Sequence, residues 1–402
     1  MTSQLNGVRI LVADDQSDVA RTLCRPLSKS GARLRFVTDG ETALAEVNTR
    51  PYDLLLIDMK MPPYEWGGLW LLQELQKGGW RMPSLVLSGE GSKQQVIEAL
   101  RMGASDWVVK DDAGEELLER CVKVLSDRMN HSLEFAGTSL PTPLARRFAR
   151  YSRTIDREKR ISEGLHALEA IFRFAAILGL SSTTPAPLRG IRPDQFAAPS
   201  MGTWFSLCTA LGTLPDAGDD FVRMLSWLVP ERSDHQLVQE LISARNDLAH
   251  GRGAPTSTQA EQLDGLLRRF AHRASSSWRA DLTVPTTMTY DGTVYVADVL
   301  SLRGVDRPVP KKVEIQAPVI TGQAFLVPRD AAPVPLAPWF LTQMDETSNS
   351  VRCFQFDGMH RDKDGLVPAA PFKYAKTDEG AEVATVSHPD ATWQTLTAWV
   401  AN

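Results

Sequence analysis

Four short apolar runs in the first 110 residues each end in a polar side chain. The runs lie at residues 9–13, 54–57, 84–87 and 106–109. The side chains that follow them are Asp14, Asp15, Asp58, Ser88 and Lys110. Such runs, separated by amphipathic segments, are typical of buried parallel strands that alternate with helices. The pattern predicts a doubly wound α/β domain over residues 1–130, with these side chains at the carboxyl ends of its strands.

The five side chains suit phosphorylation of Asp58. A carboxylate that accepts a phosphoryl group needs a hard divalent cation, and Asp14, Asp15 and Asp58 offer the oxygen ligands that Mg²⁺ prefers. Lys110 and Ser88 add a cation and a hydroxyl that can bond phosphate oxygens. A pair of aspartates alone would be weaker evidence, because other doubly wound folds bind ligands in the same crevice. We therefore predict a Mg²⁺-dependent phosphoacceptor site.

Residues from about 8 to 130 resemble the receiver domain of two-component response regulators. The resemblance implies that Asp58 is the phosphoacceptor and that Ser88 and Trp107 form a switch pair, with Trp107 in the place of a more usual Tyr or Phe. The implied Mg²⁺ ligands are Asp14, Asp15, Asp58 and the backbone carbonyl of Lys60. The implied partner is a cognate histidine kinase or phosphotransfer protein.

Two features depart from the pattern of that family. Asp111 follows Lys110, where the family usually has a proline after a cis peptide bond. A cis bond before another residue costs about 2.5–4 kcal/mol, so we expect this bond to be trans or strained. The loop MPPYEWGG, residues 61–68, is longer than the common version. Neither departure removes a chemical group from the predicted site.

From the last part of the predicted α/β domain onward, the pattern is one of helical spacing. Residues 113–129 have the spacing of a last amphipathic helix, and Gly137, Pro141 and Pro143 predict a linker over residues 131–143. Residues 144–280 then predict an all-α helical bundle. Its expected helices lie at residues 144–180, 202–214, 219–229, 234–250 and 258–274.

The first of these helices carries four arginines close to one face, which fits phosphate binding or a solvated surface. These arginines are Arg146, Arg150, Arg153 and Arg157. From about residue 281 to residue 402, short β-branched and aromatic runs alternate with Gly, Pro, Asp and Asn, which predicts a β-rich C-terminal domain. The expected fold class is therefore multidomain, with an α/β doubly wound domain, an all-α bundle and a β-rich domain.

The segment SARNDLAHG, residues 243–251, contains a second candidate site. A guanidinium such as that of Arg245 can neutralise a scissile phosphate, and an imidazole such as that of His250 can transfer a proton near neutral pH. Asn246 and His250 are four positions apart and share a helix face. Arg245 and His250 lie about 140° apart around a helix axis, so we expect a facing copy of the helix to complete the site.

This motif resembles the Rx4–6H motif of HEPN domains, which occurs in dimeric RNases. The resemblance implies a metal-independent RNase with Arg245, Asn246 and His250 as catalytic residues, RNA as substrate, and a homodimer. A helical module followed by a β-rich tail also resembles effector regions of stress-signalling or phage-defence proteins. Alternatively, the module mediates dimerisation or binds a partner protein without catalysis, and residues 245–250 end a helix capped by Gly251.

Composition and charge narrow the remaining classes. The chain has 402 residues and a formal net charge of -5, so contact with nucleic acid would need a local basic patch. The four cysteines form no CxxC pair, which argues against a zinc site and favours a reducing compartment. We find no signal-peptide pattern, and residues 168–180 are too short to span a bilayer, so we expect a cytoplasmic protein without membrane contact.

Overall fold

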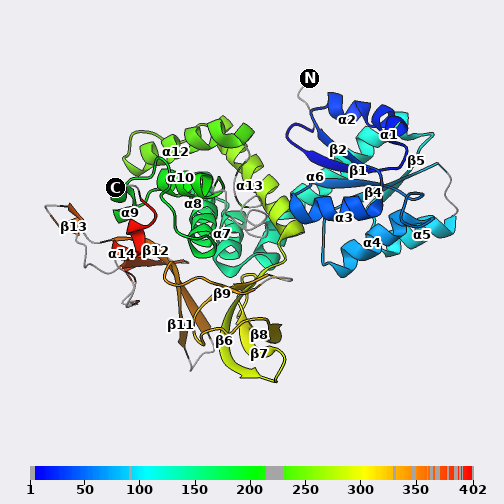
Figure 1. Cartoon of the computed structure of the whole chain (residues 1–402). Coiled ribbons are helices and arrows are strands. Elements are labelled where there is room, and N and C mark those ends of the chain that lie inside the picture. The colour runs from blue at the N-terminus through cyan, green and yellow to red at the C-terminus, as the bar shows by residue number, and fades with distance from the viewer. Residues whose placement is uncertain are drawn as a thin grey trace. The chain divides into compact units, whose positions relative to one another are not determined.

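The computed structural model of the chain is shown in Figure 1. The residues that it describes are 5–89, 93–213, 228, 230, 232–328, 332–345, 350–359, 361–362, 365–366, 372–377, 380–383, 388, 391 and 393–400. They divide into two compact units. The first unit contains Met1–Leu133 and Arg268–Ser277, and the second contains Glu134–Leu267 and Trp278–Asn402.

The first unit is the predicted doubly wound α/β fold. Its strands are β1 (Arg9–Ala13), β2 (Arg33–Val37), β3 (Leu54–Asp58), β4 (Ser84–Ser88) and β5 (Asp106–Val109). Its helices are α1 (Ser17–Leu23), α2 (Arg25–Lys29), α3 (Gly40–Thr49), α4 (Gly67–Lys77), α5 (Lys93–Arg101) and the beginning of α6 (Ala113–Ser139). The strands form one parallel sheet in the order β2-β1-β3-β4-β5.

Apolar strand residues build the core of this unit. Every residue of β3 and β4 is buried, and the sheet packs against α6 through buried side chains such as Leu117 and Cys121. The register places Ile10 beside Leu54 and Asp58 beside Leu87. Because all five strands run in the same direction, their polar carboxyl-terminal residues lie at one edge of the sheet.

The second half of α13 (Ser257–Ser277) belongs to this unit and contacts it where β3 begins. No sequence pattern predicted this contact. Asp53 precedes β3, and its carboxylate accepts two hydrogen bonds from Arg273, at 2.7 and 2.8 Å. It also accepts a bond from the backbone N–H of Arg9 at 2.7 Å. The His272 Nε2 donates to the Asp53 backbone carbonyl at 2.9 Å. Residues distant in sequence therefore belong to the α/β unit.

The segment expected as a linker is mostly helical. Helix α6 continues to Ser139, and the boundary between the two compact units falls within this helix, between Leu133 and Glu134. Gly137 is compatible with the helix because a single glycine costs only about 1 kcal/mol relative to alanine. Pro141 precedes the next helix, where a proline needs no intrahelical hydrogen-bond donor.

The helices of the second unit agree in broad position with the expected bundle, although the predicted helix over residues 144–180 is two helices. They are α7 (Thr142–Arg153), α8 (Arg157–Ser182), α9 (Pro193–Ala197), α10 (Met201–Leu211), the 3-10 turn η1 (Arg232–Asp234), α12 (His235–Ala249) and the beginning of α13. Asp156 separates α7 from α8, and its side chain caps α8 by accepting from the backbone N–H of Lys159. The helix expected at residues 219–229 lies almost wholly outside the described residues.

Helix α8 forms the centre of the second unit. Its 26 residues are longer than the expected apolar stretch and apolar enough to cross a membrane by length and composition. However, 72% of its most apolar window is buried inside the protein. Phe172, for example, packs against Phe205 of α10 with ring centroids 5.1 Å apart. Burial of this kind is typical of the core helix of a globular unit.

The β-rich region belongs to the same compact unit as these helices. Its strands are β6 (Asp281–Tyr290), β7 (Tyr295–Ser301), β8 (Val309–Ile315), β9 (Phe325–Val327), β10 (Val334–Pro335), β11 (Phe340–Asp345), β12 (Ser350–Met359), β13 (Arg361–Asp362), β14 (Gly365–Leu366), β15 (Phe372–Lys376) and β16 (Gly380–Val383), followed by helix α14 (Trp393–Thr397). The larger sheets have the orders β10-β9-β6-β7-β8 and β11-β12-β15-β16. Trp204 of α10 packs edge-on against Phe356 of β12, which joins helices and sheet in one core.

Candidate phosphoacceptor site

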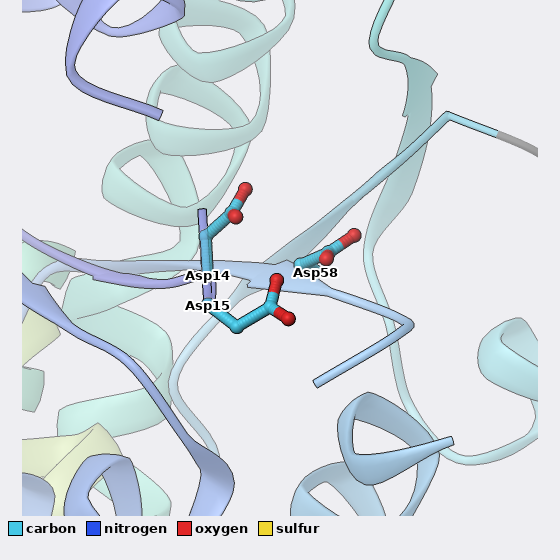
Figure 2. A group of neighbouring side chains, drawn as sticks. All are labelled: Asp14, Asp15 and Asp58. Carbon is cyan, nitrogen blue, oxygen red and sulfur yellow. The ribbon is translucent and has the colours of Figure 1, made fainter. Parts of the chain in front are cut away.

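Three carboxylates meet where β1 and β3 end, as Figure 2 shows. One oxygen from each of Asp14, Asp15 and Asp58 lies within 4.8 Å of the others. Asp14 and Asp58 are buried, with side chains 1% and 5% exposed, whereas Asp15 is exposed. Asp14 and Asp58 therefore form the buried side of the site, and Asp15 lies on the side that is open to solvent.

Lys110, which follows β5, joins two of these carboxylates. Its Nζ lies 2.8 Å from Asp14 Oδ2 and 3.3 Å from Asp58 Oδ1. Burial raises the pKa of Asp58 to about 6, and the negative charges of Asp14 and Asp15 add to this rise, although Lys110 opposes it. Burial alone would lower the pKa of Lys110, but its contacts with Asp14 and Asp58 outweigh burial and raise it. One ammonium group thus incompletely compensates three neighbouring carboxylates.

The residues present fit a Mg²⁺ ion. Hard oxygen donors from three carboxylates converge, and carboxylate oxygens are the protein ligands that Mg²⁺ uses. Burial is the largest cause of the raised pKa of Asp58, and the negative charges of Asp14 and Asp15 add a repulsion to it. A divalent cation held by Asp14, Asp15 and Asp58 would relieve that repulsion. Lys60, whose backbone carbonyl is expected as a further ligand, lies two residues after Asp58, the last residue of β3.

The other predicted site residues lie on the neighbouring strands. Ser88 is buried at the end of β4, and its backbone carbonyl accepts from the Lys110 N–H at 2.8 Å. Trp107 is half-buried on β5, in register with Val86. Among the described residues, cis peptide bonds occur at Pro62-Pro63 and Ala337-Pro338, so the bond between Lys110 and Asp111 is trans.

Two glycines hold the long loop of residues 61–68 against the site. The Gly68 N–H donates to the Met59 carbonyl at 3.2 Å, and the Gly67 N–H donates to the Met61 carbonyl at 3.1 Å. A Cβ on Gly68 would lie 2.3 Å from the Asp58 carbonyl oxygen, and one on Gly67 would lie 2.0 Å from the Met61 carbonyl oxygen. Only glycine permits this backbone approach, which explains the GG pair at the beginning of α4.

The residues of the second candidate site are not gathered together within one chain. Arg245 lies on α12, is 31% exposed, and forms an ion pair with Glu169 of α8 at 3.1 Å. Asn246 and His250 are exposed, and His250 is the residue that ends α12. Arg245 and His250 thus point to different surroundings, as their spacing predicted.

Most arginines of the predicted basic face of α7 and α8 lie at the surface, and two of them contact polar side chains there. Arg150 pairs with Glu163 at 2.7 Å, and Arg157 donates a hydrogen bond to Ser257. Arg153 is exposed. The neighbouring Arg147, outside that set, instead lines a cavity together with Arg245. No local sequence signal identifies Arg147, because its cavity is assembled from segments far apart in the chain.

We expect Asp58→Asn to stabilise the first unit by about 1–3 kcal/mol at pH 7.5 without Mg²⁺. Since the pKa of Asp58 is raised to about 6, the folded chain binds more protons than the unfolded chain between about pH 4 and pH 6. Stability therefore falls as the pH rises through this window, and the amide removes that loss. Urea unfolding at pH 7.5 and pH 5, monitored through hydrogen exchange of the β3 amides, measures the difference in the free energy of unfolding between the wild type and the variant. A variant no more stable than the wild type at pH 7.5 would contradict the electrostatic description.

Comparisons with known proteins identify this unit. A family model described as the response regulator receiver domain matches residues 10–122. The chain is 35% identical over 113 residues to the two-component response regulator PhoP of Pseudomonas aeruginosa, which covers 28% of this chain and 49% of that protein. It is 37% identical over 114 residues to the response regulator MprA of Mycobacterium ulcerans, covering 28% of this chain and 48% of that protein.

A solved receiver domain, from the Francisella response regulator 1452, is 33% identical and covers 30% of this chain and 98% of that chain, with a TM-score of 0.28. The chain spans about half the length of the two curated relatives, 49% and 48%, and the matched part is the N-terminal third of this chain. The matched residues contain the three carboxylates, Ser88, Trp107 and Lys110. Residues 10–122 are therefore a response regulator receiver domain.

Proposed function

We propose that this chain is a response regulator that accepts a phosphoryl group on Asp58 from a histidine kinase, a phosphotransfer protein or a small phosphodonor. The observation that carries the proposal is the contact of Lys110 with both Asp14 and Asp58 beside the convergent carboxylates. Incubation with acetyl phosphate and Mg²⁺, followed by intact-mass measurement of the wild type and Asp58→Asn, tests it. Only the wild type should gain a phosphoryl group.

The chain's own residues account for most of the transfer. An Asp58 carboxylate oxygen attacks the phosphorus of a phosphohistidine, and the new O–P bond forms as the N–P bond breaks. The electron pair of that bond goes to the departing imidazole nitrogen, which takes up a proton. Asp14, Asp15 and Asp58 would hold Mg²⁺, which when bound neutralises charge on the transferred oxygens. Lys110 and the Ser88 hydroxyl then bond the phosphoryl oxygens, and phosphorylation adds nearly two negative charges at Asp58.

We further propose that the helical region is a HEPN-like, metal-independent RNase whose composite site forms between two copies of the chain. The exposure of Asn246 and His250 and the position of Arg245 beside a cationic cavity support a role at a surface that meets a partner. Arg245 would neutralise the scissile phosphate, His250 would transfer the proton, and Asn246 would orient the imidazole or the phosphate. Incubation of the purified chain with RNA in the presence of EDTA tests this proposal.

A second candidate function is a non-enzymatic output, in which the helical region mediates dimerisation or binds a partner protein. The ion pair between Arg245 and Glu169 favours it, because this contact uses the arginine to stabilise packing between α12 and α8. Absence of RNA cleavage together with dimer formation in light scattering would favour this function over the nuclease. A setting in stress or phage defence fits either output and is part of the proposal.

In both cases, phosphorylation controls the output by shifting a population. A receiver can bias the helical region only through contacts that differ between its two states, and a shift from mostly off to mostly on needs about 5.5 kcal/mol. Helices α6 and α13 contain residues of both units, so they are the segments through which such a bias would pass.

A further inference from the structure

A cavity of about 270 Å³ lies inside the second unit, between its helices and the sheet that contains β12 and β15. Its arginine and lysine lining consists of Arg147, Arg173, Arg245 and Lys376. Its acidic lining consists of Glu169 and Asp357. The cavity wall therefore has an excess of two positive charges, although the whole chain has a net charge of -5.

Both carboxylates are already paired within the wall. Glu169 lies 3.1 Å from the Arg245 guanidinium and 3.7 Å from that of Arg173. Arg173 also lies 2.8 Å from Asp357, and its guanidinium stacks over Trp204 at 5.1 Å from the ring centroid. These contacts fix the two guanidinium groups, with side chains only 16% exposed for Arg173 and 31% for Arg245. A fixed guanidinium loses little conformational entropy when it binds an anion.

Arg147 is the cation of this wall that lacks such a partner. It is half-buried on α7, and within the described part of the chain no hydrogen bond or ion pair reaches its guanidinium. Burial lowers the pKa of Arg147, and the attraction of Glu163 and Glu169 does not offset this effect. Burying a charge without a partner costs free energy, so an anion bound beside Arg147 would stabilise this wall.

We propose that this cavity binds a phosphate monoester, with Arg147, Arg173 and Arg245 around its phosphate group. The two excess positive charges match a dianionic phosphate better than a carboxylate, and guanidinium groups offer the paired N–H donors that phosphate oxygens accept. His166, also on the wall, can add one N–H donor. The volume is below the roughly 300–1,000 Å³ of cavities that enclose drug-sized ligands, so the cavity takes the phosphate and a small substituent.

Arg245 belongs to both this cavity and the proposed nuclease site, but this proposal does not require RNA cleavage, because it concerns phosphate binding within one chain and is tested at Arg147, which has no part in the proposed nuclease. Calorimetric titration of the full chain in EDTA, with inorganic phosphate and separately with glycerol phosphate as a small phosphate monoester, tests it. We expect saturable binding of one ligand per chain. Tighter binding of glycerol phosphate than of inorganic phosphate would support a small phosphate monoester as the ligand, and equal binding of the two would contradict the monoester.

The matched variants are Arg147→Gln, Arg147→Lys and Arg153→Gln. Arg147→Gln should weaken binding at least tenfold, and Arg147→Lys, which keeps the charge and most of the packing, should weaken it less. Arg153→Gln removes the same charge from the exposed face of α7 and should bind as the wild type does. Circular dichroism checks folding of each variant. No binding to the wild type at millimolar ligand, or equal losses in Arg147→Gln and Arg153→Gln, would overturn the proposal.

Discussion

An equimolar mixture of the Arg245→Ala and His250→Ala proteins is expected to cleave RNA at about a quarter of the wild-type rate, after subunit exchange. Each variant alone should lose at least about a hundredfold of activity, since removal of a charge-stabilising donor or a general acid–base has effects of that size. With the proposed composite site, the arginine of one chain and the histidine of the other would form one intact site in a mixed dimer. Half of the dimers would be mixed, and one of the two sites in each mixed dimer would be intact, which gives one quarter of the wild-type number of sites.

The mixing experiment separates a composite site from a site within one chain. If Arg245 and His250 acted within the same chain, no mixture could restore activity. Products with 2′,3′-cyclic phosphate ends, formed in EDTA, would support attack by the 2′-hydroxyl. A strict requirement for Mg²⁺, or monomers in light scattering with and without beryllofluoride, would contradict the composite nuclease.

Arg273→Ala is expected to destabilise the first unit by about 3–5 kcal/mol. Asp53 is 1% exposed, and Arg273 supplies two of its hydrogen bonds as well as one to the Gly7 carbonyl at 2.8 Å. Burial alone would raise the pKa of Asp53, but Arg273 outweighs it and holds that pKa below its ordinary value. Without the guanidinium, a buried carboxylate loses its partner. Denaturant unfolding, followed by hydrogen exchange in β1 and β3, measures the loss.

Two variants control for this effect. Arg101→Ala removes an exposed arginine from α5 of the same unit and should change stability by less than about 0.5 kcal/mol. The double variant Asp53→Asn with Arg273→Met leaves no charge buried and should recover part of the loss. If Arg273→Ala were as stable as the wild type, α13 would not be an integral part of the receiver unit.

The local sequence predicted those parts of the structure that depend on short-range patterns. The strand ends with Asp14, Asp58 and Lys110 could be predicted because an apolar run and the polar residue that follows it are adjacent in sequence. Helix existence in the second unit followed from apolar spacing for the same reason. Helix ends could be predicted less well. Helix α6 continues through Gly137, because tertiary packing outweighs the weak tendency of a single glycine to end a helix.

Long-range contacts were beyond prediction from one sequence. The contact of Arg273 with Asp53 joins residues 220 positions apart, and neither residue belongs to a motif. The same holds for the wall of the cationic cavity, where Arg147 of α7 lies opposite Asp357 and Lys376 of two strands. Such sites depend on how elements pack, and the burial of an apolar face does not specify which polar side chains meet beside it.

The most direct test of the central assignment is to locate the phosphoryl group on the chain. After reaction with acetyl phosphate and Mg²⁺, borohydride reduction converts an aspartyl phosphate to homoserine, which peptide mass spectrometry can locate. We predict homoserine at Asp58 alone, no labelling when Mg²⁺ is removed by EDTA, and none in the Asp58→Asn variant. Homoserine at Asp14 or Asp15 in the wild type, or undiminished labelling of Asp58→Asn, would contradict the account.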